Sequence, residues 1–391
     1  MENSYLPAIV VVAFNRKHAL KRLLHSLAQS TCPDNTPLVI SIDHDADNGD
    51  VLDAARNFSW PFGPKQVIYQ KENLGLKQHI VQCGDLVNTY GSVIILEDDL
   101  FVSPYFYLYA RNALDYYDKD DQISGISLFN YPKIEKREDP LPFYPVQDHS
   151  DVYFLQYAAS SGQAWTRRQW NEFREWFDHK TSLKAYHGRV PQNVMEWPMR
   201  SWKKFFITYM VEQDKYFVYP TLSLSTNFDD QGSNRFKDTN EVQARLKIDD
   251  RPFLFKPLTE SYNIYDSFFE LLPSTFNQFN PDLGEYDYEV DLYGLKKDYE
   301  ISKPWILTTK PCKKAAMRFG RKLKPHEMNV FFNVPGDEIA LCRKEALTGY
   351  SREEDPGMYV SDFSYFYRHP LTRRDLMKFL KYTFRRKLPI S

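Results

Sequence analysis

Cysteine is scarce in this sequence, and its spacing excludes two ways of stabilising a small domain. The four cysteines among 391 residues are scattered, and no two of them form a CxxC pair. Structural zinc sites and disulfide frameworks use closely spaced or numerous cysteines. We therefore predict neither, and we expect a reducing, cytoplasmic setting for the protein.

Long apolar runs and a large excess of one charge are also missing. A membrane-spanning helix needs about 18 or more consecutive apolar residues, and no such run occurs. The first stretch, MENSYLPAIVVVAFNRK, lacks the basic start and the small-residue cleavage site of a secretory signal. The net charge of −2 makes no strongly positive chain, so nucleic acid is not an expected partner.

Two glycine-rich motifs that bind nucleotides are absent as well. The chain has no GxxxxGK[ST] loop, and no GxGxxG follows its first apolar run. ATPases and dinucleotide-dependent oxidoreductases are therefore disfavoured. A nucleotidyltransferase stays open as an alternative, although it would be expected to carry a glycine-rich loop where this chain has FNRKH (14–18).

The first half of the sequence does contain a regular alternation of strand-like and helix-like segments. Its apolar, β-branched runs are typical of strands buried on both faces. Leucines at helical spacing follow the first run. The expected strands are 8–14, 37–43, 67–69, 92–96 and 123–129, and the expected helices are 17–29, 74–87 and 104–117. This order predicts an α/β fold with a mostly parallel sheet flanked by helices.

The pattern changes twice along the chain, which suggests three parts. Residues 1–130 carry the regular alternation, and residues 131–300 a looser, mixed pattern. Residues 301–391 are rich in lysine and arginine, with basic blocks at 310–324 and 371–388. We expect this last part to be a helical, basic extension.

Three consecutive acids follow the fourth expected strand, in the segment VIILEDDL (93–100). Ligands of open α/β sheets lie beyond the carboxyl ends of the strands. The first two expected strands end in further polar groups, Phe14-Asn15-Arg16 and Asp43-His44-Asp45. If these strands are neighbours, the groups share one rim with Glu97, Asp98 and Asp99. The alternative is that the acids form a solvated turn.

Carboxylate oxygens at a strand end suit a hard cation such as Mg²⁺ or Mn²⁺. Such an ion bridges the phosphates of a nucleotide and offsets charge on a phosphate leaving group. Side chains alternate along an extended segment, so we expect Glu97 and Asp99 on one side and Asp98 on the other. Asp99 is then the first metal ligand, and Asp98 faces a ribose or a neighbouring polar group.

Seven segments of the chain occur in a familiar order and spacing. They are VVVAFNRKHALKRLLHSL, ISIDHDAD, ENLGLKQHI, VIILEDDLFVSPYFYLYARNALDYY, SSGQAWTRRQW, SWKKFFITYMVEQDKYFVYPTLSLSTN and YEVDLYGLKK. Together they resemble GT-A glycosyltransferases, and in particular N-acetylglucosaminyltransferase I-like enzymes and their bacterial relatives. The likeness covers roughly residues 6–300 and is most specific in the first hundred.

The resemblance implies a Rossmann-like GT-A fold with a nucleotide-sugar half and an acceptor half. It implies transfer of a sugar from a nucleotide-diphosphate donor, with a UDP-sugar favoured, and inversion at the anomeric carbon. The expected cofactor is Mn²⁺ or Mg²⁺, and the expected acceptor is a saccharide or a lipid-linked saccharide. Polysaccharide or glycoconjugate assembly is the expected setting.

The resemblance also assigns roles to individual residues by matched position. Asp99 and Glu97 belong to the acidic metal motif, and Asp43 matches an acid that contacts uracil. Lys77 lies in the segment near the diphosphate. The residues expected around the nucleotide from the first loop are Ala13, Phe14 and Arg16. Two alternatives stay open: Asp43 caps the next turn, and Lys77 is a surface lysine of a helix.

One departure from the family pattern concerns the catalytic base. Family members carry an acid after a tryptophan in the 201–206 block, and that acid takes the proton of the acceptor hydroxyl. Trp202 matches the tryptophan, but Lys203 and Lys204 occupy the acid positions. A lysine cation cannot accept a proton unless its pKa is strongly lowered.

Three explanations for the missing acid are open. Glu196, in the segment MEW (195–197), supplies the base instead. A later acid, Asp229 or Asp230, reaches the acceptor. Otherwise the chain is a weak transferase, or an inactive module that binds nucleotide or sugar without turnover.

The basic segment LTRRDLMKFLKYTFRRKL (371–388) places Leu, Met and Phe at helical spacing among basic residues. It suits a surface helix packed on the protein. It equally suits an amphipathic helix on the anionic inner face of a membrane, where a lipid-linked acceptor would lie. Contact with an anionic acceptor is a third use.

Overall fold

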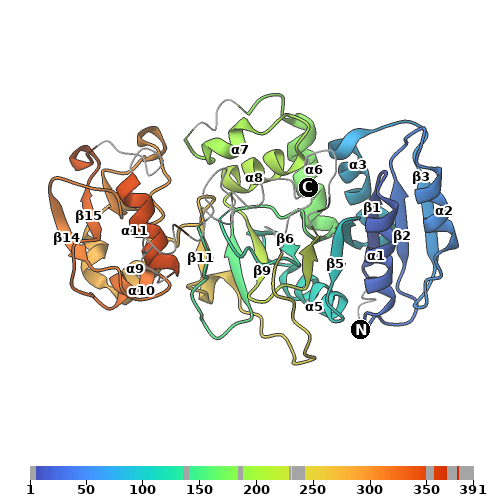
Figure 1. Cartoon of the computed structure of the whole chain (residues 1–391), viewed down its shortest axis with the longest axis horizontal. Coiled ribbons are helices and arrows are strands. Elements are labelled where there is room, and N and C mark those ends of the chain that lie inside the picture. The colour runs from blue at the N-terminus through green and yellow to red at the C-terminus, as the bar shows by residue number, and fades with distance from the viewer. Residues whose placement is uncertain are drawn as a thin grey trace. The chain divides into compact units, whose positions relative to one another are not determined.

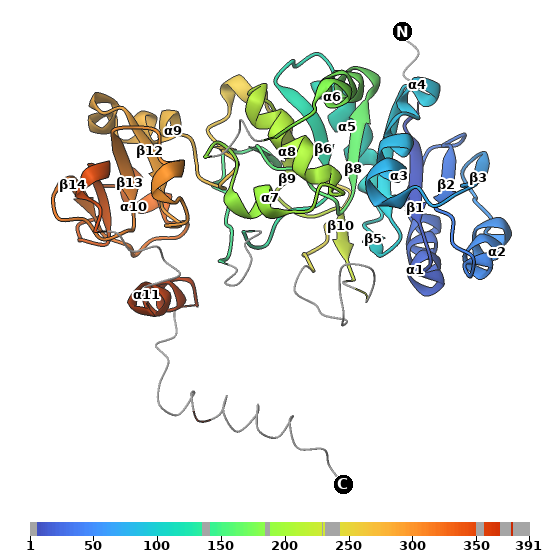
Figure 2. The ribbon, with the colours of Figure 1, turned by 90° about the horizontal axis from the view of Figure 1, so that it is seen from above.

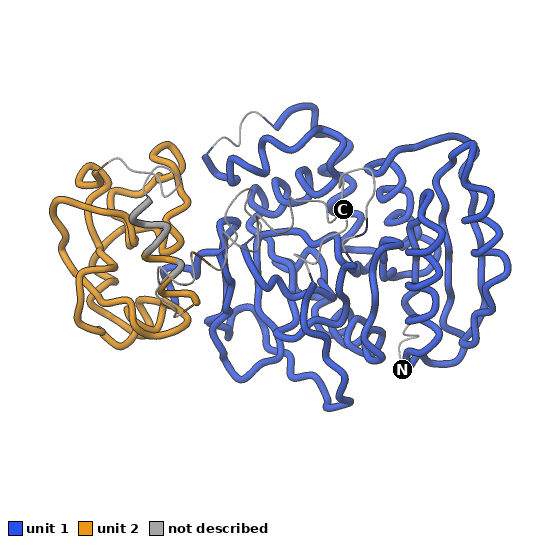
Figure 3. Tube along the Cα trace, viewed as in Figure 1, with its two compact units in different colours: residues 1–275 blue, residues 276–391 orange. Residues whose placement is uncertain are grey.

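The computed structural model describes residues 6–134, 141–183, 188–228, 230, 243–348, 356–367 and 377. The chain falls into two compact units, Met1–Thr275 and Phe276–Ser391 (Figure 3). The division lies before the boundary expected at residue 300. Each unit is described by itself below.

The first unit is built on a nine-stranded mixed sheet in the order β11-β7-β9-β6-β8-β4-β1-β2-β3 (Figure 1). Most neighbouring strands are parallel, but β8 runs antiparallel to both β4 and β6, and β7 runs antiparallel to β9. The bounds are β1 Ala8–Ala13, β2 Leu38–Ile42, β3 Lys65–Tyr69, β4 Ser92–Glu97, β6 Ile123–Ser127, β7 Val152–Leu155, β8 Gln163–Thr166, β9 Tyr216–Pro220 and β11 Ile264–Tyr265. The predicted α/β fold with a mostly parallel sheet is confirmed.

The three strands expected to end at one rim are indeed neighbours, because β1 pairs with both β4 and β2 in parallel. The register aligns Val12 with Glu97 and Ala13 with Ile42. Nearly all residues of these strands are buried, as expected for strands covered on both faces. The carboxyl ends of all three strands therefore lie at one edge of the sheet.

Helices cover both faces of this sheet. On one face, α1 (Lys17–Ala28), α2 (Gly49–Asn57) and α5 (Phe106–Tyr117) contribute to one buried cluster, which also includes Ile9 and Val11 of β1. The helices of the other face are α3 (Gly75–Gly84), α6 (Arg167–His179) and α8 (Trp202–Glu212). There Trp165 of β8 packs against Trp170 and Phe206. Two further short α-helices of this unit are α4 (Val87–Tyr90) and α7 (Gln192–Glu196).

A two-stranded ribbon continues from the central sheet strand β4. Strand β5 (Leu100–Val102) begins after the acidic turn and pairs antiparallel with β10 (Ser225–Asn227) (Figure 2). Segments more than a hundred residues apart in sequence are thereby joined immediately beyond Asp99.

The second unit contains a sheet in the order β12-β13-β15-β14. Its elements are β12 Tyr288–Asp291, β13 Trp305–Thr308, β14 Ala315–Phe319, α10 Glu327–Phe331, β15 Ile339–Arg343 and α11 Pro356–Tyr367, after α9 Pro273–Phe279 at the division between the units. The expectation of a helical extension over 301–391 is therefore wrong in part. Basic residues outnumber acidic ones there, but the short runs WILT and IALC are mostly buried and pair with each other.

The basic segment 371–388 lies outside the described residues, apart from Met377. In the part of the chain that the structure describes, no helix combines the length and the apolar character that crossing a membrane requires.

Candidate functional site

The acids that follow β4 lie in a tight turn. Strand β4 ends at Glu97, Asp98 and Asp99 form the turn, and β5 begins at Leu100. The alternation of side chains expected along an extended chain does not apply across a turn. As a result Asp98 and Asp99 both contact the same partner, Arg16, and the predicted placement of Asp98 on the opposite side from Asp99 is corrected.

Arg16 connects the end of β1 to the acids after β4. Its Nη1 donates a hydrogen bond to Asp99 Oδ2 at 2.9 Å, and its Nη2 donates to Asp98 Oδ1. Burial lowers the pKa of Arg16, but the two carboxylates more than offset it and raise the pKa above the ordinary value. The guanidinium is therefore a permanent cation within the acidic turn.

The three acids do not carry three full negative charges at neutral pH. Burial, followed by the charges of Asp99 and Asp98, raises the pKa of Glu97 to about 8, against the opposing effect of Arg16 and Lys203. Burial also raises the pKa of Asp98 to about 6, and Arg16 opposes that rise. Glu97 is therefore mostly protonated near pH 7, which reduces repulsion within the turn.

A second segment holds Asp99 from the opposite side. Asn227 Nδ2, at the end of β10, donates to Asp99 Oδ1 at 3.2 Å, and the amide of Phe228 donates to the Asp99 carbonyl at 3.0 Å. The Asp99 side chain is consequently only 13% exposed. Sequence reasoning missed Asn227, because its position beside Asp99 depends on the pairing of β5 with β10.

The acidic turn has the donor chemistry for a divalent cation. Asp98 Oδ2 is a buried carboxylate oxygen without a hydrogen-bond partner, and hard cations take such oxygens. Both oxygens of Asp99 already accept hydrogen bonds, so an ion at this turn would compete with Arg16 for them. Among the described residues, no group of three or more His, Cys, Asp or Glu is arranged to hold a metal.

Asp43 is buried just after β2 and accepts hydrogen bonds from backbone amides of its own loop and of the start of α3. Its Oδ1 accepts hydrogen bonds from the amides of His44 and Leu74, both at 2.9 Å, and its Oδ2 accepts one from Gly75 at 3.0 Å. Gly75 begins α3 with a φ of +72°, a conformation that favours glycine. The capping alternative is thus observed, while the contact with uracil stays a prediction.

The remaining residues expected around a nucleotide lie near the same strand ends. Ala13 is the buried last residue of β1, and the carbonyl of Phe14 accepts a hydrogen bond from Asn48 Nδ2 at 2.7 Å. Asn48 Nδ2 also donates to the Asp43 carbonyl at 2.8 Å, so it links the ends of β1 and β2. Sequence reasoning did not single out Asn48.

Lys77, on α3, is directed toward aromatic side chains of the neighbouring helices. Its Nζ lies 4.8 Å from the ring centre of Phe205 on α8 and 5.9 Å from that of Phe177 on α6. Cation–π contacts of this kind hold a lysine in place. The predicted role of Lys77 near a diphosphate stays a prediction.

The two lysines at the positions where the resemblance predicts an acid have different surroundings. Lys204 Nζ donates to the carbonyls of Met195 and Trp197, at 2.7 and 2.8 Å, and so fastens the end of α7 to α8. Lys203 Nζ lies 5.0 Å from the ring centre of Trp197. It also lies close enough to Glu97 to lower the pKa of that acid.

The candidate catalytic bases are distributed over separate places. Glu196 is exposed on α7 and accepts a hydrogen bond from Gln192 at 3.2 Å. Asp230 forms an ion pair with Arg22 of α1, whose guanidinium lies 3.8 Å from the ring centre of Phe228. Asp229 lies outside the described residues.

Comparisons with known proteins give limited likenesses. No family model and no curated protein matches the chain. Among solved structures, a mannosyltransferase from Pyrobaculum calidifontis in complex with GDP-Man and Mn²⁺ has 14% identity and a TM-score of 0.31, over 44% of this chain and 47% of that one. TarS from S. aureus has 12% identity and a TM-score of 0.35, over 56% of this chain and 59% of that one.

A third solved structure, GalNAc-T7 with UDP, GalNAc and Mn²⁺, has 15% identity and a TM-score of 0.35, over 56% of this chain and 43% of that one. The chain thus spans about half the length of these proteins. TM-scores of this size are too low to define a shared family, so the functional argument rests on the residues of the site.

Proposed function

We propose that the first unit is a GT-A-type glycosyltransferase that uses a nucleotide-diphosphate sugar, with a UDP-sugar favoured. The proposed acceptor is a saccharide or a lipid-linked saccharide. The observation that carries the proposal is the meeting of Arg16 with Asp98 and Asp99 at the carboxyl ends of two neighbouring parallel strands. This is the edge of an α/β sheet where nucleotides bind.

A structural ion pair is the competing explanation of this contact. Buried ion pairs are expensive to form, because desolvation offsets much of their attraction. Here Asp98 also keeps a buried oxygen without a partner. A buried carboxylate oxygen without a hydrogen-bond partner is poorly explained by stability alone. It favours a site in which a bound ligand supplies the missing partner.

The residues of the turn would have different roles toward a bound donor. Asp99 and Asp98 would hold Mn²⁺ or Mg²⁺, and the ion would offset the negative charge of the donor diphosphate. Arg16 adds a fixed positive charge beside the same phosphates. The pKa of Glu97 is about 8 in the metal-free turn, and a divalent cation on the two neighbouring acids would favour its ionised form.

The lysines at the expected positions of the catalytic base are engaged elsewhere. Lys204 is engaged by two backbone carbonyls, and Lys203 is a cation beside Glu97. Neither is placed as a proton acceptor for an acceptor hydroxyl. A module that binds a nucleotide sugar without turnover is therefore the second candidate function.

Thermal unfolding tests donor binding, because a ligand that binds the folded state raises the apparent stability of the protein. The Tm is measured with UDP-sugars and with GDP-sugars, each in the presence and in the absence of Mn²⁺. We expect a UDP-sugar to raise the Tm and Asp99→Asn to abolish the rise. Asp53→Asn, on the exposed side of α2, serves as the matched control and should keep it. No rise with any donor would contradict the proposal.

Turnover separates the two candidates once a donor is found. Release of UDP with a panel of saccharide acceptors identifies a transferase. Donor binding without release of UDP, across all acceptors and in their absence, identifies the binding module.

A further inference from the structure

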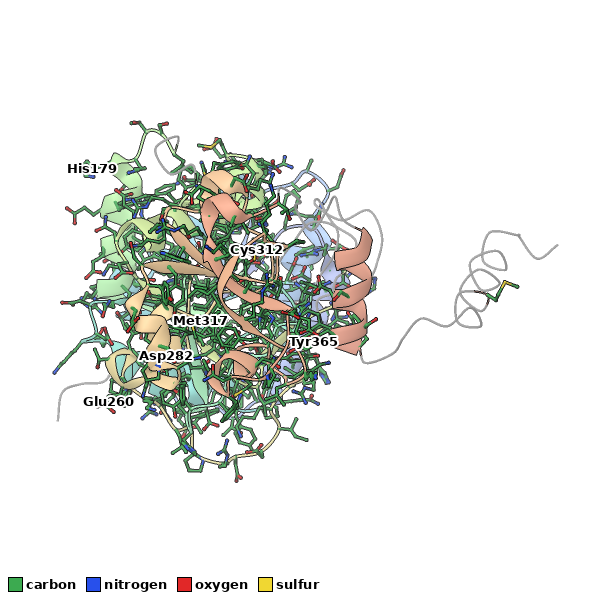
Figure 4. All side chains as sticks on the ribbon, turned by 90° about the vertical axis from the view of Figure 1, so that its left-hand side faces the viewer. His179, Glu260, Asp282, Cys312, Met317 and Tyr365 are labelled. Carbon is green, nitrogen blue, oxygen red and sulfur yellow. The ribbon has the colours of Figure 1, made fainter. Side chains whose placement is uncertain are left out.

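Two of the four cysteines lie together in the second unit. Cys342 is a buried residue of β15, and Cys312 is half-buried in the segment between β13 and β14. Cys312 is labelled in Figure 4. Both thiols are free, and they lie within hydrogen-bonding reach of each other. The other two cysteines, Cys32 and Cys83, belong to the first unit.

The backbone keeps the two thiols close. Cys312 forms a bridge with Leu347, which follows β15 in the chain. Two backbone hydrogen bonds, at 2.9 and 3.1 Å, hold the neighbours of Cys312 beside residues 346–348. As a result Cys312 and Cys342 pack in the same small apolar cluster. A disulfide requires the sulfur atoms to approach to about 2 Å, and both side chains already lie in this cluster.

Cys312 is the thiol that an external reagent can reach. It lines a pocket of about 350 Å³ together with Arg318, whereas Cys342 is 0% exposed. Arg318 Nη2 lies 3.9 Å from Cys312 Sγ. A positive charge at this distance favours the thiolate, which is the reactive form of a cysteine. Asp337 Oδ1, 3.8 Å from Arg318 Nε, weakens that effect without removing it.

We propose that Cys312 and Cys342 form a reversible disulfide when a peroxide reaches the second unit. The Cys312 thiolate attacks one oxygen of hydrogen peroxide and becomes a sulfenic acid, and hydroxide leaves. The Cys342 sulfur then displaces the hydroxyl group from Cys312 Sγ, and its proton leaves with that group as water. Two thiols are thereby oxidised to one disulfide, and one peroxide is reduced to two waters.

The order of these steps follows from the surroundings of each thiol. Burial raises the pKa of Cys342 to about 12, so this thiol stays protonated near neutral pH. It suits the second step, which is intramolecular and gains from the closeness of the two groups. The bond would fasten the pocket wall at Cys312 to β15. The proposal is independent of the function assigned to the first unit, because both cysteines lie in the second.

Hydrogen peroxide treatment of the full chain near neutral pH, followed by alkylation of the remaining thiols and peptide mapping, tests the proposal. We expect the intact mass to fall by about 2 Da and one peptide pair to be joined through Cys312 and Cys342. Dithiothreitol should reverse both changes. Cys32 and Cys83 are internal controls and should stay thiols, because both are buried and burial raises the pKa of each to about 12.

Variants separate the two steps. Cys342→Ala should stop the reaction at the Cys312 sulfenic acid, which dimedone labels, and Cys312→Ser should leave Cys342 a thiol. Arg318→Gln should slow the loss of the Cys312 thiol about two- to fivefold. Lys314→Gln, at an exposed position that does not line the pocket, should leave the rate unchanged. Thermal unfolding checks that Cys342→Ala keeps the fold, and half-buried Cys312 gives an answer if it does not.

Three outcomes would overturn the proposal. One is that no linked peptide forms, whether Cys312 stays a thiol or is oxidised alone. Another is a disulfide that joins two chains through Cys312, seen as a dimer on a non-reducing gel. The third is formation of the same bond at the same rate in the urea-unfolded chain, which would mean that the fold does not favour it.

Discussion

Arg16 Nη1 donates to Asp99 Oδ2 at 2.9 Å, so the cation that follows β1 is bonded to an acid that follows β4. The same guanidinium also bonds Asp98. The turn is therefore charge-compensated from within the chain, and any external cation or ligand has to compete with Arg16.

This competition predicts how metal affinity responds to Arg16. Arg16→Gln should increase the affinity for Mn²⁺ about tenfold or more, because it releases Asp98 and Asp99 and removes a like charge. The free Mn²⁺ signal in electron paramagnetic resonance measures binding without any need for turnover. Lys17→Gln, at the half-buried neighbouring position, is the control with the same change in charge. An unchanged or lower affinity in Arg16→Gln would show that Arg16 and the ion do not share the acids.

Asp43 provides a prediction about stability. Asp43→Ala leaves three backbone amides without their acceptor, so the free energy of unfolding should fall by about 2–4 kcal/mol. Urea denaturation with linear extrapolation measures the loss. Asp47→Asn, at an exposed position of the same loop, should change it by less than about 0.5 kcal/mol. Equal effects of the two substitutions would refute the structural role of Asp43.

The raised pKa of Glu97 predicts a dependence of stability on pH. The pKa is about 8 in the folded state against 4.5 as the ordinary value, so between these values the unfolded state loses the proton first. The contribution of Glu97 to the free energy of unfolding is fully present below pH 4.5, and it is lost as the pH rises to 8. Glu97→Gln cannot ionise, and the decline in unfolding free energy from pH 5 to pH 8 should be smaller by up to about 3 kcal/mol. Parallel declines in the variant and the original protein would contradict this.

Lys204 gives a test of the packing between α7 and α8. Lys204→Met keeps the length of the side chain but removes the hydrogen bonds to the carbonyls of Met195 and Trp197. We expect a loss of about 1–3 kcal/mol in unfolding free energy, seen as a lower Tm. Lys215→Met is the comparison variant for the change in Tm. It removes hydrogen bonds to Glu172 and to the Asp121 carbonyl at a more peripheral site. A Tm equal to that of the original protein would show that Lys204 does not fasten α7.

The strands β4, β1 and β2 could be predicted from the sequence, because strands buried on both faces form continuous apolar runs, but that they are neighbours is known only from the structure. The rim that they share followed from the rule for parallel sheets. The relative directions of Asp98 and Asp99 could not be predicted, because the alternation rule assumes an extended chain and these residues form a turn. The partner Asn227 depends on a pairing between segments far apart in sequence, for which no local signal exists.

The second unit was harder to predict for a different reason. The basic composition of residues 301–391 suggested a helical extension, whereas β14 alternates half-buried and exposed residues at an edge of the sheet. Arg321 lies in the basic block 310–324, but its burial against Asp362 and Tyr365 depends on where α11 packs. Composition cannot distinguish a buried arginine from its exposed neighbours.

The ribbon formed by β5 and β10 has a mechanical consequence for the acidic turn. Asp99 is tied to this ribbon by its own carbonyl and by Asn227, as well as to β1 by Arg16. A shift of the chain near residue 227 would therefore pull directly on a carboxylate of the rim. Whatever occupies the neighbourhood of β10 could in this way displace Asp99 without touching it.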